Sequence, residues 1–322
     1  MHKPVTVVDR LERHQVVLYL GAIIAGFVLG ASAPGPAENL AIAITPLLGA
    51  LLYVTFLQVR FADLVDSVRD RRFLAAVLVL NFGVAPVVVA ALSFALPADD
   101  AIRLGALLVL LCPCVDYVVV FTGLAGGDAR RMLAATPLLL IVQMLLAPLY
   151  LAVLLGDGRS VIDPSPFVWA FLALIVLPLV LAWITQRWSR TSPVGRRVQD
   201  GASTAMVPLM MGVLVVAVSS QVPQVDSRFG DIAGVIPIYV AFLVVMALAG
   251  LAVTRVFRLA PASATAAVFS GATRNSLVVL PLALALPVGA ELAAATVIAQ
   301  TLVELIGMVV LVWGFTCAAR RR

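Results

Sequence analysis

The most constraining feature of the sequence is a succession of apolar segments, each about 20 residues long, that fill both halves of the chain. A helix of this length spans the hydrocarbon core of a bilayer. Only 12% of the residues are charged and 62% are apolar, whereas soluble domains average about 25% charged residues. The apolar runs are continuous rather than alternating, which disfavours a β-barrel. The sequence therefore predicts an all-α polytopic membrane protein.

Ten segments meet this length criterion, so we expect ten transmembrane helices in a lipid bilayer. They cover residues 15–33, 38–58, 73–95, 102–124, 129–155, 165–187, 203–222, 232–254, 262–286 and 290–316. If the N-terminus is cytoplasmic, eighteen of the 22 Lys and Arg residues fall in cytoplasmic segments and three fall outside. Basic residues are enriched in cytoplasmic loops. We therefore expect a plasma (inner) membrane protein with both termini cytoplasmic. The same loops account for the net charge of +5, which does not indicate nucleic-acid binding.

The second and seventh predicted spans share the order Pro, Gly, Gln along an apolar run. These residues are Pro46, Gly49 and Gln58 in one span, and Pro208, Gly212 and Gln221 in the other. The offset is about half the chain, so each half holds five spans and enters the membrane in the opposite sense. The pattern predicts two inverted five-helix repeats, residues 1–160 and 161–322, an architecture that many secondary transporters use.

The fourth and ninth predicted spans carry helix-breaking sequence near their middles. The fourth contains Pro113, which lacks a backbone donor and clashes with the preceding turn. The ninth contains the polar run 270–276, Ser-Gly-Ala-Thr-Arg-Asn-Ser. The two spans hold equivalent positions in the repeats, and interrupted segments at corresponding positions are typical of transporter binding sites. We expect the site there; kinks without function are the alternative.

Three ionisable residues lie well inside predicted spans: Asp116, Arg274 and Glu304. Each costs on the order of 2.5–3.5 kcal/mol at a helix centre, so such residues face the protein interior. Asp116 and Arg274 lie on the two broken helices, which predicts an ion pair. Glu304 lies one turn from Gln300, so both can face one cavity, where the carboxyl group could carry a proton. Purely structural roles in helix packing are the alternatives.

Cys112 and Cys114 lie on either side of Pro113. In a regular helix residues two apart diverge, but a break at the proline allows the thiols to converge. Two sulfur atoms in a polar gap suit a soft, thiophilic substrate. The alternative is that both are small buried apolar residues.

Signals for other functions are absent from the sequence. It has no Walker A motif, and its two histidines are His2 and His14. We therefore expect no ATP, no other cofactor, no metal centre and no enzymatic activity. The expected partner is a small-molecule substrate, either a metalloid or an organic anion.

Three short stretches resemble known transporters. The segment from Cys114 to Asp128 is similar to the fourth-span signature of arsenite-efflux permeases, in which a cysteine stands fourteen residues before the aspartate of a Gly-Asp pair. Residues 302–304, Leu-Val-Glu, resemble a motif of the same permeases whose glutamate is functionally important. Residues 274–276, Arg-Asn-Ser, are more similar to the Gln-Asn-Ser of bile acid:sodium symporters, which share the ten-helix fold and the superfamily.

The resemblance implies a core domain of spans 3–5 and 8–10, in which the broken fourth and ninth helices cross, and a panel domain of spans 1, 2, 6 and 7. The site would lie between them near the bilayer midplane. The implied function is efflux of arsenite or antimonite in exchange for protons. The implied roles are a metalloid contact for Cys114, helped by Cys112, further substrate contacts for Arg274, Asn275 and Ser276, and proton coupling for Glu304 and Asp116.

The chain also departs from its relatives. The sodium-coupled relatives have a glutamate at Ser270 and a glutamine at Arg274. A fixed positive charge at Arg274 would repel a sodium ion, so we expect protons rather than sodium as the coupling ion. The alternative function is carriage of a small organic anion, bound by Arg274 and by the N-termini of the half-helices.

Overall fold

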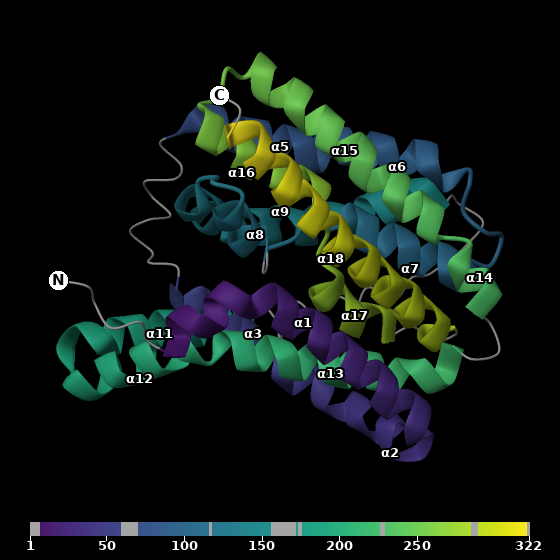
Figure 1. Cartoon of the computed structure of the whole chain (residues 1–322), viewed down its shortest axis with the longest axis horizontal. Coiled ribbons are helices and arrows are strands. Elements are labelled where there is room, and N and C mark those ends of the chain that lie inside the picture. Colours follow the sequence, from purple (N-terminus) through teal and green to yellow (C-terminus); the bar gives the residue numbers. More distant parts are fainter. Residues whose placement is uncertain are drawn as a thin grey trace. The chain divides into compact units, whose positions relative to one another are not determined.

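The chain is an all-α membrane protein in a computed structural model that describes residues 7–58, 70–115, 118–155, 172, 176–225, 229–284 and 289–320. It divides into two compact units, each of which combines helices from both halves of the sequence (Figure 1). Unit 1 comprises Met1–Gln58 and Val168–Ser227, and unit 2 comprises Val59–Phe167 and Arg228–Arg322.

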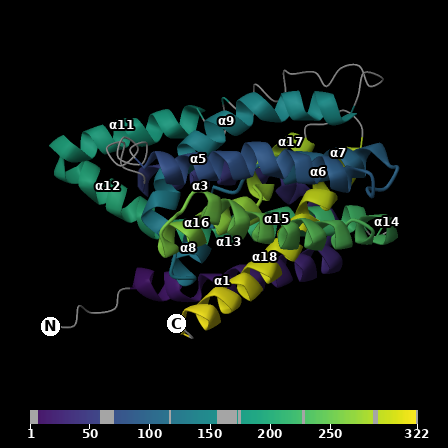
Figure 2. The same cartoon turned by 90° about the horizontal axis from the view of Figure 1, so that it is seen from above.

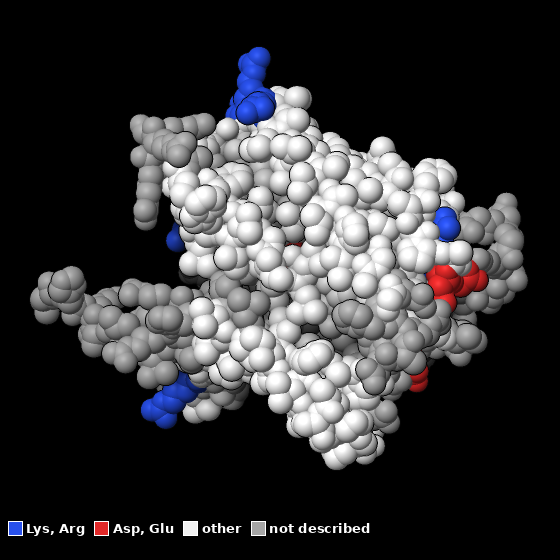
Figure 3. Space-filling model, turned by 45° about the vertical axis from the view of Figure 1, so that its right-hand side comes forward, with Lys and Arg blue, Asp and Glu red and all other residues white. Residues whose placement is uncertain are grey.

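Several helices are long and apolar enough to cross a membrane. Among the described residues these are Arg71–Ser93, Ile236–Val256 and Glu291–Cys317, and two bent pairs raise the number to as many as five. The bent pairs are Ala129–Thr136 with Leu138–Leu151, and Pro193–Ala202 with Met206–Ser220. In the view of Figure 3 the charged side chains of the described residues gather near the edges, and the middle is almost free of them, as contact with lipid requires. The count of ten spans and the inverted repeat stay predictions.

Unit 1 is built around the close packing of its first and last helices. Its elements are α1 (Val7–Ser32), α2 (Pro34–Asn39), η1 (Leu40–Ala43), α3 (Ile44–Gln58), α11 (Leu177–Thr191), α12 (Pro193–Thr204) and α13 (Met206–Val225). Helices α1 and α13 lie side by side (Figures 1 and 2). A Cβ atom on Gly26 would lie 2.8 Å from the Val215 carbonyl oxygen, and one on Gly30 would lie 2.6 Å from that of Ser219. Only glycine allows the two backbones to approach this closely.

Polar contacts join α3 to α11 within unit 1. The hydroxyl groups of Tyr53 and Thr185 are 2.9 Å apart, and Gln186 Nε2 donates to the Phe56 carbonyl oxygen at 3.0 Å. The following helix, α12, lies almost entirely outside the predicted spans because its sequence is polar. Ser192 caps it, because its hydroxyl oxygen accepts from the amide of Val194 at 3.2 Å.

Unit 2 holds the remaining helices and both predicted helix breaks. Its elements are α5 (Arg71–Val79), η2 (Leu80–Val84), α6 (Ala85–Ser93), α7 (Asp100–Leu111), α8 (Val118–Leu124), α9 (Ala129–Leu155), α14 (Phe229–Ala233), α15 (Ile236–Val256), α16 (Pro261–Ala272), α17 (Ser276–Leu284) and α18 (Ala290–Arg320). The long helix α18 packs against α7, α15 and α17 (Figure 1), so it borders both breaks.

A π-helical turn, η2, joins α5 to α6 without ending the helix. Pro86 has no amide hydrogen, so it cannot bond to the Phe82 carbonyl oxygen one turn earlier. The hydroxyl of Tyr150 donates to that oxygen instead, at 2.7 Å, while the amide of Ala85 bonds to Leu80 in the wider turn. The turn contains the buried residue Asn81, which matters for the site.

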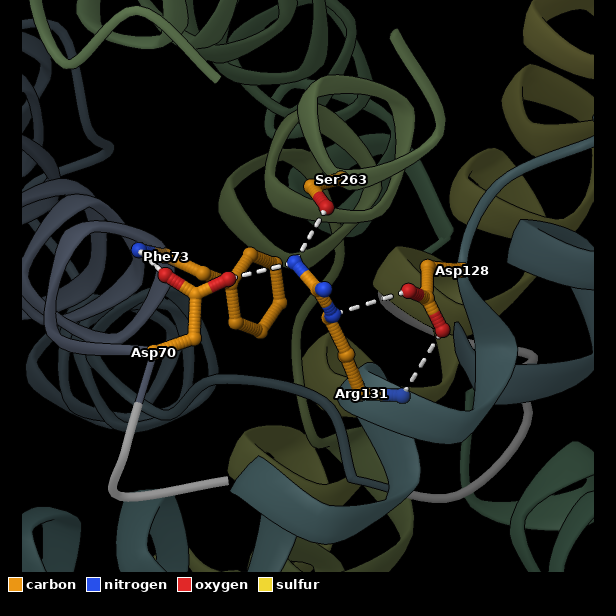
Figure 4. Close-up of polar contacts among 5 residues, drawn as sticks. All are labelled: Asp70, Phe73, Asp128, Arg131 and Ser263. Carbon is orange, nitrogen blue, oxygen red and sulfur yellow. Dashed lines mark hydrogen bonds and ion pairs between the residues drawn. The ribbon is translucent and has the colours of Figure 1, made fainter. Parts of the chain in front are cut away.

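The first turns of α5, α9 and α16 meet around one arginine (Figure 4). Arg131 Nη1 donates to the Asp70 carboxylate and, at 3.0 Å, to the Ser263 hydroxyl. Its Nε lies 3.0 Å from Asp128 Oδ2. Asp70 also caps α5 by accepting from the Phe73 amide at 3.2 Å. This Arg131 cluster ties three helix N-termini together at one end of unit 2.

Candidate substrate site at the crossing of two interrupted helices

The first interruption follows directly from a proline. Helix α7 ends at Leu111, and Cys112 adopts extended backbone with φ −102° and ψ 112°. A residue before proline is sterically disfavoured in helical conformation, so Cys112 cannot continue the helix into Pro113. The chain becomes helical again at Val118, where α8 begins.

The second interruption lies in the polar run of the ninth predicted span. Helix α16 ends at Ala272, and Thr273 is extended with φ −100° and ψ 147°. Helix α17 begins at Ser276. Asn275 caps it, because its Oδ1 accepts from the Val278 amide at 3.2 Å. Both helix breaks that the sequence predicts are therefore present.

The two extended segments cross and pair through their backbones. Pro113 and Arg274 face each other in an antiparallel bridge. On either side of it the Cys114 amide donates to the Thr273 carbonyl at 3.3 Å, and the Asn275 amide donates to the Cys112 carbonyl at 2.7 Å. Unwound backbone inside a membrane protein must find partners in the protein, and this pairing provides them.

The crossing has two faces with different chemistry. Side chains alternate along extended backbone, so we expect Cys112 and Cys114 to project to one side and Pro113 to the other. Residues directly opposite in an antiparallel pair share a face, which puts Asn275 with the cysteines and Arg274 with Pro113. We call these the thiol face and the arginine face. Both cysteines are buried, and no disulfide joins them in the part of the chain that the structure describes.

Glu304 connects the crossing to α18. Its Oε2 atom accepts a hydrogen bond of 2.7 Å from the backbone amide of Arg274. The same oxygen accepts from Gln300 Nε2, one turn earlier on α18. The carboxyl group is 1% exposed. Its charge state therefore acts directly on the backbone of the crossing.

Among the described residues, the Arg274 side chain is the largest one that is completely buried. Its Nη2 donates to Asn81 Oδ1 at 3.0 Å and to the Gly271 carbonyl oxygen. Its Cζ lies 5.0 Å from the centroid of the Phe242 ring. Asn81 Nδ2 in turn donates to the Ser270 hydroxyl at 2.9 Å. These contacts join η2, α15 and α16 around the arginine face. Asp116 lies outside the described residues, so its pair with Arg274 stays a prediction.

Some neutral polar atoms near the crossing are buried and have no hydrogen-bond partner within the described ranges. They are Asn275 Nδ2, Ser276 Oγ and Gln300 Oε1. Buried polar groups are nearly always hydrogen-bonded, so such atoms indicate capacity for a ligand or water. Together they offer an amide donor, a hydroxyl and a carbonyl acceptor.

The sequence did not single out Asn81 or Phe242. Asn81 carried a usable signal, because it is an amide in the middle of the apolar segment 73–95, where polar side chains are costly. Phe242 carried none, since an aromatic residue in an apolar helix is ordinary. Gln143 of α9 carried the same sequence signal as Asn81, an amide in an apolar segment. It is completely buried, and neither polar atom of its side-chain amide has a hydrogen-bond partner among the described residues.

Comparison with known proteins identifies one family. The sequence pattern of the Sodium Bile acid symporter family matches residues 45–228, more than half of the chain. The match includes the first interruption and ends before the second. No curated protein matches the sequence significantly.

Proposed function

The chain belongs to the Sodium Bile acid symporter family, and on this premise we propose that it exports trivalent arsenic or antimony in exchange for protons. Membership makes the protein a membrane transporter of the bile acid:sodium symporter type, in a family of transporters rather than enzymes. The substrate and the coupling ion are the proposal.

The observation that carries the proposal is the thiol face. Cys112 and Cys114 are buried on one side of the crossing of two interrupted helices, the kind of place where secondary transporters bind substrate. Arsenite is mostly the neutral As(OH)₃ at pH 7, and a thiol can replace one hydroxyl reversibly: RSH and As(OH)₃ give RS–As(OH)₂ and water. Soft sulfur ligands favour such a thiophilic centre.

The neighbouring polar atoms support binding of the arsenic hydroxyl groups. Asn275 Nδ2 can donate to a hydroxyl oxygen, and Gln300 Oε1 can accept a hydroxyl hydrogen. A site with two thiols and a few hydrogen bonds holds the substrate weakly enough to release it. We assign the main contact to Cys114 and a supporting contact to Cys112.

Glu304 is our choice for the proton carrier. Its carboxylate accepts two hydrogen bonds, from the Arg274 amide and from Gln300. Protonation from outside would weaken both bonds and so loosen the crossing as the substrate leaves. Asp116 remains the second candidate. Alternating access would come from movement of one unit against the other, as in other secondary transporters.

Arsenite accumulation in everted membrane vesicles tests the proposal. The protein is expressed in an arsenite-hypersensitive bacterium, and uptake is compared with and without a proton gradient. Wild type should accumulate arsenite only with the gradient, and Cys114→Ser should not accumulate it. Cys317→Ser, near the end of α18, is the matched control and should behave as wild type. An absence of uptake by well-expressed wild type would reject arsenite as the substrate.

A second candidate substrate is a small organic anion. The N-terminus of α17 carries partial positive charge, and Asn275 Nδ2 and Ser276 Oγ, at that terminus, are buried without a hydrogen-bond partner among the described residues. Backbone amides and these two donors would suit a carboxylate or sulfonate. Cys114→Ser separates the two candidates, because it should abolish arsenite transport and leave organic-anion transport largely intact.

A further inference from the structure

The arginine face of the crossing is built like a binding site for a monovalent cation. Around the Arg274 guanidinium are Asn81 Oδ1 at 3.0 Å and the Gly271 carbonyl oxygen. The face of the Phe242 ring lies on one side, 5.0 Å from Cζ. Amide oxygens, carbonyl oxygens and an aromatic face are groups that attract any cation. They come from three elements, η2, α15 and α16, so they do not belong to one local turn.

We infer that the Arg274 guanidinium is a tethered cation that permanently occupies this site, so the transporter needs no sodium ion there. The inference rests on the proposed function only in taking the protein to be a secondary transporter. It does not depend on arsenite as the substrate. It identifies Asn81, Gly271 and Phe242 as the lining of a cation site that the protein fills with its own side chain.

Repulsion between like charges supports permanent occupation. Arg274 is completely buried and Glu304 almost completely, at 0% and 1% exposure. The Glu304 carboxyl group, which carries the opposite charge when it is ionised, accepts a hydrogen bond from the Arg274 amide. A sodium ion entering beside the guanidinium would lie next to a like charge in a medium of low dielectric constant, which is strongly unfavourable.

The geometry also holds the guanidinium in place. Asn81 is fixed by its own amide hydrogens, because Nδ2 donates to the Val77 carbonyl at 3.0 Å and to Ser270 Oγ at 2.9 Å. These donations leave Oδ1 as the end of the side chain that faces Arg274. The π-helical turn sets this orientation, and Tyr150 stabilises that turn through Phe82. The lining is therefore preorganised for a positive charge rather than shaped by the arginine alone.

Removal of the arginine side chain should expose the site to free cations. In Arg274→Ala the oxygens of Asn81 and Gly271 and the Phe242 ring would surround a space of guanidinium size. Free guanidinium at concentrations far below those that denature proteins should bind there. Sodium or potassium should bind there as well, since either restores the charge opposite Glu304. Arg274→Lys keeps a tethered positive charge, so it should bind none of these three cations at the site.

The experiment measures thermal unfolding of purified full-length protein, with choline, sodium, potassium or guanidinium as the chloride salt at equal ionic strength. We expect the unfolding temperature of wild type to be the same in choline, sodium and potassium chloride. The unfolding temperature of Arg274→Lys should likewise not depend on which of these salts is used. We expect Arg274→Ala to be stabilised by guanidinium and by sodium or potassium over choline, and the stabilisation should grow with the logarithm of cation concentration. The readout needs no transport substrate, so failure of the arsenite proposal leaves it unaffected.

Two results obtained with folded protein would overturn the inference. One is stabilisation of wild type by sodium over choline, because the site would then not be filled by Arg274. The other is folded Arg274→Ala that responds to none of the cations. If that variant is recovered only when it is purified with guanidinium or sodium, the dependence supports the inference. If neither it nor Arg274→Gln is recovered under any of these conditions, Arg274 is a packing residue and the inference fails.

Discussion

The two units of the molecule are stabilised in different ways. In unit 1, α1 and α13 pack through Gly26 and Gly30, and the joins between α3 and α11 are neutral hydrogen bonds. In unit 2 the described helices surround two buried ionisable groups, Arg274 and Glu304, and two broken helices. Buried charge and unwound backbone are costly in a membrane. Unit 1 therefore has the features of a scaffold, while unit 2 contains the candidate site.

The largest functional effect should come from unit 2. Glu304→Gln keeps a side-chain oxygen that can accept from the Arg274 backbone amide. The glutamine side chain, however, cannot take up a proton. We expect proton-driven arsenite uptake to fall to the level of empty vesicles, while exchange of labelled for unlabelled arsenite persists. Glu291→Gln, at an exposed position in the first turn of the same helix, should keep both activities. Equal loss of uptake and exchange in Glu304→Gln would contradict a coupling role.

The matching test in unit 1 concerns packing rather than chemistry. Gly30→Leu would force a side chain against the Ser219 backbone, 2.6 Å from where its Cβ would lie. Overpacking typically costs about 1–3 kcal/mol, and we expect a value near the upper end. Gly21→Leu is the control on the same helix, because nothing lies within 4 Å of a Cβ there. Thermal unfolding of the purified variants measures the difference, and equal unfolding temperatures would refute the close packing of α1 and α13.

A smaller effect is expected at Asn81. Asn81→Ala removes the side-chain bonds to Arg274 Nη2, to Ser270 and to the Val77 carbonyl oxygen. Hydrogen bonds to charged groups contribute about 1.5–3 kcal/mol to the free energy of unfolding. Because Arg274 Nη2 keeps its bond to the Gly271 carbonyl oxygen, we expect a loss of stability near the lower value. Asn39→Ala in unit 1 removes an exposed bond to Gly35 and should change the unfolding temperature far less. An unchanged unfolding temperature in Asn81→Ala would mean that the arginine face contributes little to stability.

The smallest effect should come from the Arg131 cluster. The ion pairs of Arg131 with Asp70 and Asp128 are partly exposed, since the Arg131 side chain is 44% exposed. Such pairs contribute less than about 1 kcal/mol and are screened by salt. Arg131→Gln should therefore lower the unfolding temperature slightly at low salt and hardly at all at high salt. Arg130→Gln, the neighbouring exposed residue, provides the comparison. A large loss that persists at high salt would show that the cluster acts through packing.

The sequence was most informative where one residue determines local backbone. Pro113 predicts the end of α7, and the polar run around Arg274 predicts the end of α16; both are confirmed. The family match supports the predicted superfamily and the transporter function. Arsenite as substrate, the proton as coupling ion and the roles of the site residues stay predictions.

The remaining features depend on contacts between distant segments. Which faces Cys112 and Arg274 take follows from an antiparallel pairing across half the chain, and no local pattern encodes it. The contact of Asn81 with Arg274 needs the π-helical turn at Pro86, whereas the apolar pattern predicts a regular helix there. Helix α12 was missed because a polar, capped helix carries no membrane-span signal.

The backbone pairing at the crossing has a consequence for synthesis of the chain. Helices α7 and α8 have 12 and 7 residues, and each is too short to cross the hydrocarbon core. The Cys114 amide bonds to the Thr273 carbonyl, and the Cys112 carbonyl bonds to the Asn275 amide. Both partners leave the ribosome long after the cysteines. The first broken helix must therefore wait in the insertion machinery or in a hydrated pocket until the second arrives. Assembly of the crossing is a late, non-local event, and a chain truncated before Thr273 should be recognised as unfinished by membrane quality control.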